Sequence, residues 1–88
     1  MFGEIKDWNN GWHGLSLGIS AQELDRLIQL LEQLRSDPDQ HFHVSSDYSG
    51  SGGLGDIEFY VAPANAPHNM HIGGRALAPG SNTPSAGA

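Results

Sequence analysis

Two histidines separated by one residue, His41 and His43, are the clearest candidates for chemistry in this sequence. They lie in an alternating segment that predicts a strand, so both imidazoles share one face. If that strand pairs with segment 55–61, Glu58 lies opposite His43 and Tyr60 lies opposite His41. Two imidazoles and a carboxylate suit zinc or copper. Such histidine pairs are also common in strands without a metal. The three residues are therefore metal candidates only, and we assign no cofactor.

The remaining histidines form weaker patterns. His68 and His71 have helical spacing, but the glycines at 73–74 argue against a helix there. His13 is expected on the core side of its strand, beside Asp7. Neither group predicts a metal site.

The Gly/Ser-rich segment 47–54 resembles a phosphate loop only in composition. It lacks the Gly-Lys-Ser/Thr ending and connects two predicted strands. The spacing between Asp47 and Asp56 does not supply the alternating oxygen ligands of a calcium loop. The serines do not lie in a nucleophile elbow, and a domain of this size has little room for a deep pocket. We therefore expect no catalysis.

Charge is distributed unevenly along the 88 residues. The formal net charge is −6, and all ten acidic residues lie between Glu4 and Glu58. Three of the four basic residues precede position 63, which leaves −7 for residues 1–62. An acidic domain repels phosphate backbones and is steered toward basic proteins. It also favours solubility in general. We expect no nucleic-acid binding.

The first predicted element is a β-hairpin. Segments 2–8 and 12–19 flank Asn9-Asn10-Gly11, a strong turn signal. A two-residue turn and a three-residue loop are both possible. The three-residue loop pairs Ile5 with Leu15 and gathers the apolar residues on one face, so we prefer it.

The strongest structural signal predicts a helix from about Ala21 to Arg35. Ser20 and Glu23 form a capping box, and Asp37-Pro38 ends the helix. One apolar stripe runs along it at intervals of three and four residues. Its members are Leu24, Leu27, Ile28, Leu31 and Leu34.

A second hairpin follows. Segments 41–46 and 55–61 alternate, and a turn near Gly50-Ser51 sets Val44 against Ile57. The predicted fold is α+β, in β-β-α-β-β order, with the helix packed on one face of an antiparallel sheet. Residues 1–62 form this single domain. Residues 63–88 are a Pro/Gly/Ala-rich tail that we expect to be disordered, with local docking or an edge strand at 71–77 as the alternative.

The face of the sheet opposite the helix carries an unusual aromatic and polar group. Tryptophan and tyrosine are typical interface anchors because each buries a large area with few torsions. The group can bind a protein partner or a second copy of the chain. Alternatively, the tryptophans only stabilise their hairpin or are covered by the tail. Glu4 and Lys6 share this face, and the partner-binding candidates are Trp8, Trp12, His41, His43, Glu58 and Tyr60.

The middle of the chain resembles small immunity proteins of bacterial polymorphic-toxin systems. The resemblance rests on segment 18–27, on His-Phe-His-Val at 41–44, and on Gly-Leu at 53–54 before the strand around 57–59. It covers residues 15–61. Members of that family bind and block a cognate toxin without catalysis, so the resemblance implies a toxin partner and no catalytic residues.

These observations predict a non-catalytic protein-binding module. An immunity protein that neutralises a bacterial toxin is the leading hypothesis. A small metal-binding domain or a structural, oligomeric assembly protein are the alternatives. The N-terminus resembles no signal peptide, no apolar run is long enough to cross a membrane, and cysteine is absent. We therefore expect a cytoplasmic protein that does not bind membranes.

Overall fold

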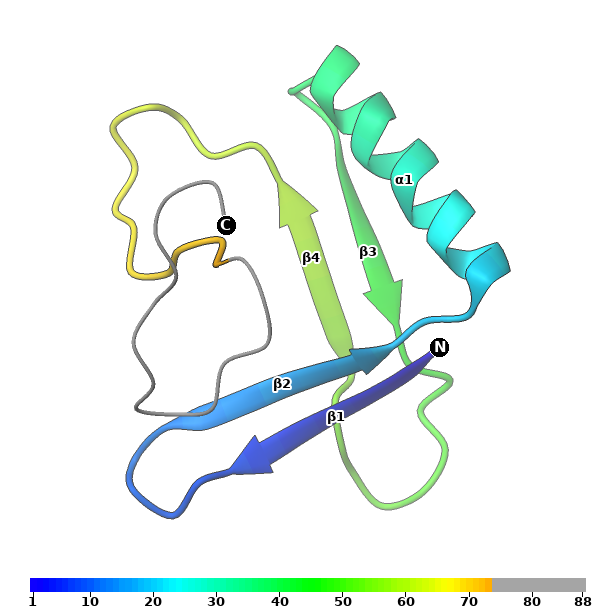
Figure 1. Ribbon diagram of the computed structural model, residues 1–88, viewed down its shortest axis with the longest axis vertical. Coiled ribbons are helices and arrows are strands. Elements are labelled where there is room, and N and C mark those ends of the chain that lie inside the picture. Colours follow the sequence, from blue (N-terminus) through cyan, green and yellow to red (C-terminus); the bar gives the residue numbers. More distant parts are fainter. Residues whose placement is uncertain (74–88) are drawn as a thin grey trace.

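The computed structural model describes residues 1–73, which contain four strands and one helix (Figure 1). The predicted α+β class and element order are confirmed. In chain order the elements are β1 (Phe2–Asp7), β2 (His13–Gly18), α1 (Ala21–Ser36), β3 (His41–Ser45) and β4 (Asp56–Tyr60).

The β1–β2 hairpin has the three-residue loop that the apolar pattern favours. Ile5 pairs with Leu15, and the Trp8 amide donates to the Trp12 carbonyl oxygen at 3.2 Å, which closes the loop. Gly11 has a φ of 92°, a left-handed conformation that glycine adopts without steric cost. The turn residues therefore fix the register of this hairpin.

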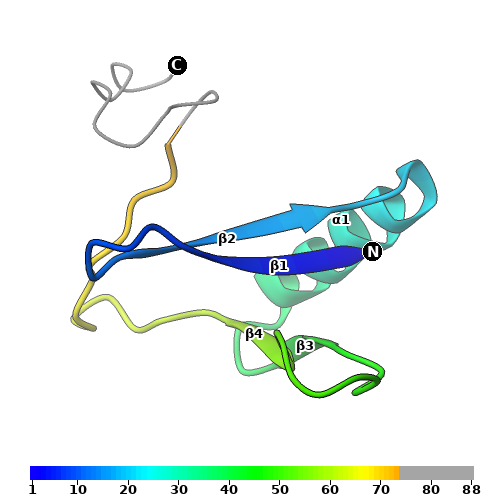
Figure 2. The ribbon, with the colours of Figure 1, turned by 90° about the horizontal axis from the view of Figure 1, so that it is seen from below.

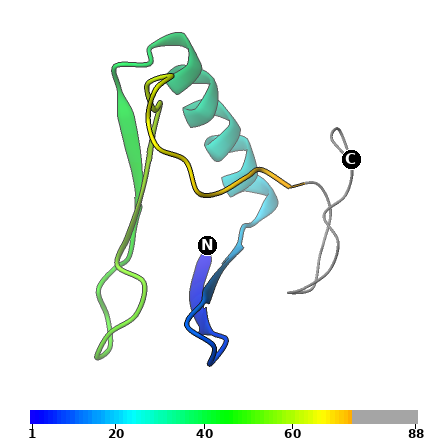
Figure 3. The same cartoon turned by 90° about the vertical axis from the view of Figure 1, so that its left-hand side faces the viewer.

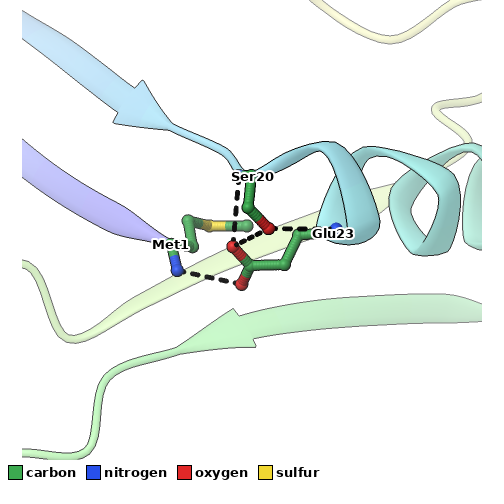
Figure 4. Close-up of polar contacts among 3 residues, drawn as sticks. All are labelled: Met1, Ser20 and Glu23. Atoms are coloured by element: carbon green, nitrogen blue, oxygen red, sulfur yellow. Dashed lines mark hydrogen bonds and ion pairs between the residues drawn. The ribbon is translucent and has the colours of Figure 1, made fainter.

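Helix α1 begins with the predicted capping box. The Glu23 amide donates to Ser20 Oγ at 3.2 Å, and the Ser20 amide donates to Glu23 Oε1 at 3.3 Å (Figure 4). The other carboxylate oxygen of Glu23 accepts from the Met1 ammonium at 2.9 Å. These hydrogen bonds, first that of the ammonium and then those of Ser20, hold the pKa of Glu23 below its ordinary value. One carboxylate thus caps the helix and ties it to the start of β1.

The β3–β4 hairpin also has its predicted register. Val44 pairs with Ile57, and Phe42 pairs with Phe59. The two phenyl rings stack with centroids 4.8 Å apart. Side chains on this face are half-buried, whereas the intervening residues are exposed, because successive side chains in a strand point to opposite faces.

The four strands form two separate sheets, each of two strands, and not the single sheet that we expected. Figures 2 and 3 show β3 and β4 in one layer, with α1 and the β1–β2 hairpin in the other. The hairpins meet at the start of β1, where a Cβ placed on Gly3 would lie 2.9 Å from Leu54 Cδ2. Each strand therefore keeps one edge without a strand neighbour among residues 1–73.

The apolar core of the described chain is small. Among residues 1–73, Leu34 alone is buried, at 8% exposure, while Leu27 and Leu30 are half-buried. The single apolar stripe expected on the helix is divided. Three of its residues lie on an exposed flank of α1, namely Leu24, Ile28 and Leu31. The helix is rotated so that only part of its apolar surface packs on the β3–β4 layer.

Residues 63–66 form a turn, in which the Ala66 amide donates to the Pro63 carbonyl oxygen, and residues 63–73 contain no helix or strand. The rest of the predicted tail, and most of the alternative edge strand at 71–77, lie outside the described residues. Across residues 1–73, α1 is neither long nor apolar enough to cross a bilayer.

Candidate functional site

The outer face of the β3–β4 hairpin brings together four of the six predicted site residues. His41 lies opposite Tyr60, and His43 lies opposite Glu58, as the sequence predicts. All four residues are exposed, and they alternate along the strands with the half-buried residues of the opposite face. This face is a polar and aromatic surface carried by two short strands.

Both imidazoles converge on a single carboxylate oxygen. The distance to Glu58 Oε1 is 4.0 Å from His41 Nε2 and 3.8 Å from His43 Nε2. The two imidazole rings lie edge to face with centroids 5.1 Å apart. One ligand atom from each of the three residues lies within 4.8 Å of the others.

Asp56 supports this cluster from the side. Its Oδ2 lies 2.8 Å from His43 Nδ1, and its Oδ1 accepts a hydrogen bond from Ser45 Oγ at 2.8 Å. Hydrogen bonds from His43 and then from Ser45 lower the pKa of Asp56. An ionised carboxylate only accepts, so the proton in this contact sits on Nδ1 of His43. The other ring nitrogen, Nε2, lies on the side of Glu58.

Sequence reasoning missed Asp56, although the signal was present. The predicted register pairs residue 44 with residue 57, and its next step pairs Ser45 with Asp56. Asp56 is then a diagonal neighbour of His43, within reach of a long side chain.

The two tryptophans do not join the histidines. Trp8 and Trp12 flank the turn of the β1–β2 hairpin, which Figures 1 and 2 place away from β3 and β4. The Trp8 ring lies over Gly14 of the neighbouring strand, where an added Cβ would be 2.8 Å from Trp8 Cζ2. Trp12 is 72% exposed. Trp8 therefore has a packing role in the hairpin, whereas Trp12 is open to a partner.

A larger apolar surface was not among the predicted site residues. On α1, Leu24 is 45% exposed, Ile28 is 52% exposed and Leu31 is 43% exposed. On the β1–β2 hairpin, Ile5 and Leu15 form an exposed cross-strand pair. The heptad spacing of the three helix residues places them in one row, a surface typical of protein contacts.

The remaining candidates stay apart. His13 lies opposite Asp7, as expected, with His13 Nε2 3.8 Å from Asp7 Oδ1, but its side chain is exposed and does not face a core. The rings of His68 and His71 lie 6.1 Å apart, outside any described helix or strand. Neither group lies with a third ligand in the part of the chain that the structure describes.

The Gly/Ser-rich loop between β3 and β4 borders an open groove of about 870 Å³, with the start of β1 on the other side. Within the loop, hydrogen bonds from the Ser49 amide and hydroxyl to Asp47 lower the pKa of that carboxyl. The aspartate thus shapes the loop itself. The groove gives a partner side chain a recess beside the apolar Leu54.

Comparisons of the chain with protein-family models, with curated proteins and with solved structures give no significant match.

Proposed function

We propose that this chain is a non-catalytic protein-binding module whose α1 flank contacts the partner. The exposed row Leu24, Ile28 and Leu31 carries the proposal. An isolated two-stranded sheet is marginally stable in water, and one buried leucine adds little to two of them. A partner that covers this row supplies the apolar contacts that the chain lacks.

The partner's chemistry follows from charge. Residues 1–62 carry a formal charge of −7, so a basic protein is attracted, while a second copy of the chain is repelled. A basic toxin domain, neutralised by this chain as an immunity protein, fits that description and the resemblance of residues 15–61. The cysteine-free sequence supports a cytoplasmic location for the complex.

A matched pair of helix variants tests the proposal. Ile28→Glu places a carboxylate in the exposed row, whereas Gln29→Glu adds the same charge one residue away. We expect wild type and Gln29→Glu to capture a basic protein from the native cell, and Ile28→Glu to lose it. Coexpression of the chain should then restore growth to cells that express the captured protein.

Three results would count against parts of this proposal. Equal capture by both variants removes the helix row from the interface. A captured protein that does not inhibit growth contradicts the immunity function. If sedimentation gives the mass of a dimer or larger assembly and no basic protein is captured, the exposed row contacts other copies of this chain, as in a structural assembly protein.

A further inference from the structure

We propose that His41, His43 and Glu58 bind a divalent transition-metal ion on the outer face of β3 and β4. The ion is of the class that prefers imidazole nitrogen, with zinc as the representative. This site is separate from the α1 flank and does not rest on the proposed function.

The three ligands are already close to coordinating positions. In a tetrahedral zinc site with bonds of about 2.0–2.1 Å, neighbouring ligand atoms lie about 3.4 Å apart. The two histidine-to-Glu58 distances are 3.8 and 4.0 Å, and the ligand atoms of all three residues lie within 4.8 Å of one another. Closing these gaps needs side-chain rotations of exposed residues and leaves the strand backbones in place. The pairing of β3 with β4 thus already holds the three ligands in register.

Asp56 is the second observation that points to a metal. Metal-bound histidines commonly donate their other ring N–H to a carboxylate, which fixes the tautomer and the ring orientation. Asp56 makes this contact with Nδ1 of His43 at 2.8 Å and is itself held by Ser45. Asp56 thus stands where the outer-shell partner of a metal-bound His43 would be expected.

The surroundings favour a cation and leave room for a further ligand. Glu58, Asp56 and the −7 charge of residues 1–62 attract a positive ion. The three ligand side chains keep about half of their surface exposed, so water completes the coordination. Two nitrogen ligands make magnesium and calcium poor fits, because both prefer oxygen.

Calorimetric titration of the full chain at about pH 7.5 tests the site, because metal ligands bind in their deprotonated forms. We expect one saturable site for Zn²⁺ and none for Mg²⁺. His43→Gln and Glu58→Gln should abolish saturable binding. Asp56→Asn should weaken it about 10–100-fold, the usual effect of losing an outer-shell partner. His13→Gln is the matched control, because His13 also faces a carboxylate but lies outside the cluster.

Two further measurements separate coordination from folding. The melting temperature in EDTA should be similar for wild type and Asp56→Asn, although their zinc affinities differ. Adding Ni²⁺ to the wild-type chain should selectively broaden the NMR signals of His41, His43 and Glu58. This measurement needs no substitution that could disturb folding. The proposal is wrong if neither Zn²⁺ nor Ni²⁺ gives saturable binding, or if His13→Gln weakens zinc binding as much as His43→Gln.

Discussion

Single residues explain two features that the sequence presents without an obvious reason. Gly14 lies within β2, where glycine is unfavourable, yet it provides the surface on which the Trp8 ring packs. Asp56 lies at a strand end, yet it orients His43 and accepts from Ser45. In both pairs, a small or charged residue determines how a ring is placed.

Gly14→Ala should displace the Trp8 ring, because the new methyl group would lie 2.8 Å from Trp8 Cζ2. We expect a loss of about 1 kcal/mol, the lower end for overpacking, since the ring can move into solvent. Urea denaturation measures the loss, and Trp8 fluorescence in a Trp12→Phe background follows the ring. Gly52→Ala is the control, because a Cβ there meets no atom within 4 Å. Equal effects of both variants would contradict the packing role.

At the scale of elements, each hairpin and the helix is specified by its own sequence. The turn at Gly11 and the alternation in β3 and β4 give the observed strand registers. The capping box at Ser20 gives the observed start of α1. Glu23 adds a connection between elements, because it caps α1 and binds the Met1 ammonium of the preceding hairpin. The start of the chain and the start of the helix are therefore coupled electrostatically.

This coupling predicts an acid sensitivity. The pKa of Glu23 is lower in the folded chain than its ordinary value of 4.5, so its ionised form favours folding. The stabilisation is present above pH 4.5 and is lost as the pH falls through the folded-state pKa. Urea midpoints measured from about pH 6 down to pH 3 should fall less steeply for Glu23→Gln than for wild type. Glu32→Gln, on the same helix, should keep the wild-type slope; equal slopes in all three proteins would contradict the prediction.

At the scale of the whole molecule, the apolar surface exceeds what the described fold covers. Leu34 is buried against the β3–β4 layer, whereas Leu31 on the same helix is 43% exposed. A folded chain gains stability mainly from side chains removed from water. The two leucines should therefore contribute to different properties, Leu34 to folding and Leu31 to association.

Leu34→Ala and Leu31→Ala separate these contributions. We expect the free energy of unfolding to fall by about 2–3 kcal/mol for Leu34→Ala and by less than about 1 kcal/mol for Leu31→Ala. Urea denaturation of the isolated chain measures both. Partner capture should show the opposite order. When both variants are folded, Leu31→Ala should lose more of the captured partner than Leu34→Ala. Similar losses of stability would show that α1 is rotated differently in solution.

Local signals account for what could be predicted, and tertiary packing accounts for what could not. The helix cap, the hairpin turn and the strand registers depend on residues close in sequence. They could therefore be predicted from the spacing of residue types. Whether two hairpins join into one sheet depends on an edge contact that leaves no periodic signal. The rotation of α1, which leaves Leu30 half-buried and Ile28 exposed, depends on the same edge contact. For the same reason, the predicted grouping of the tryptophans with the histidines on one sheet face is wrong.

The separation into two sheets has a kinetic consequence. Nearly every backbone pairing joins residues close in sequence, so the hairpins and the helix can each form in about microseconds. The contacts that hold them together are few, which leaves the docking of the pieces as the slow step. A partner that covers the α1 flank would then act as a template during folding, and the rate at which the complete structure forms would rise with the partner's concentration.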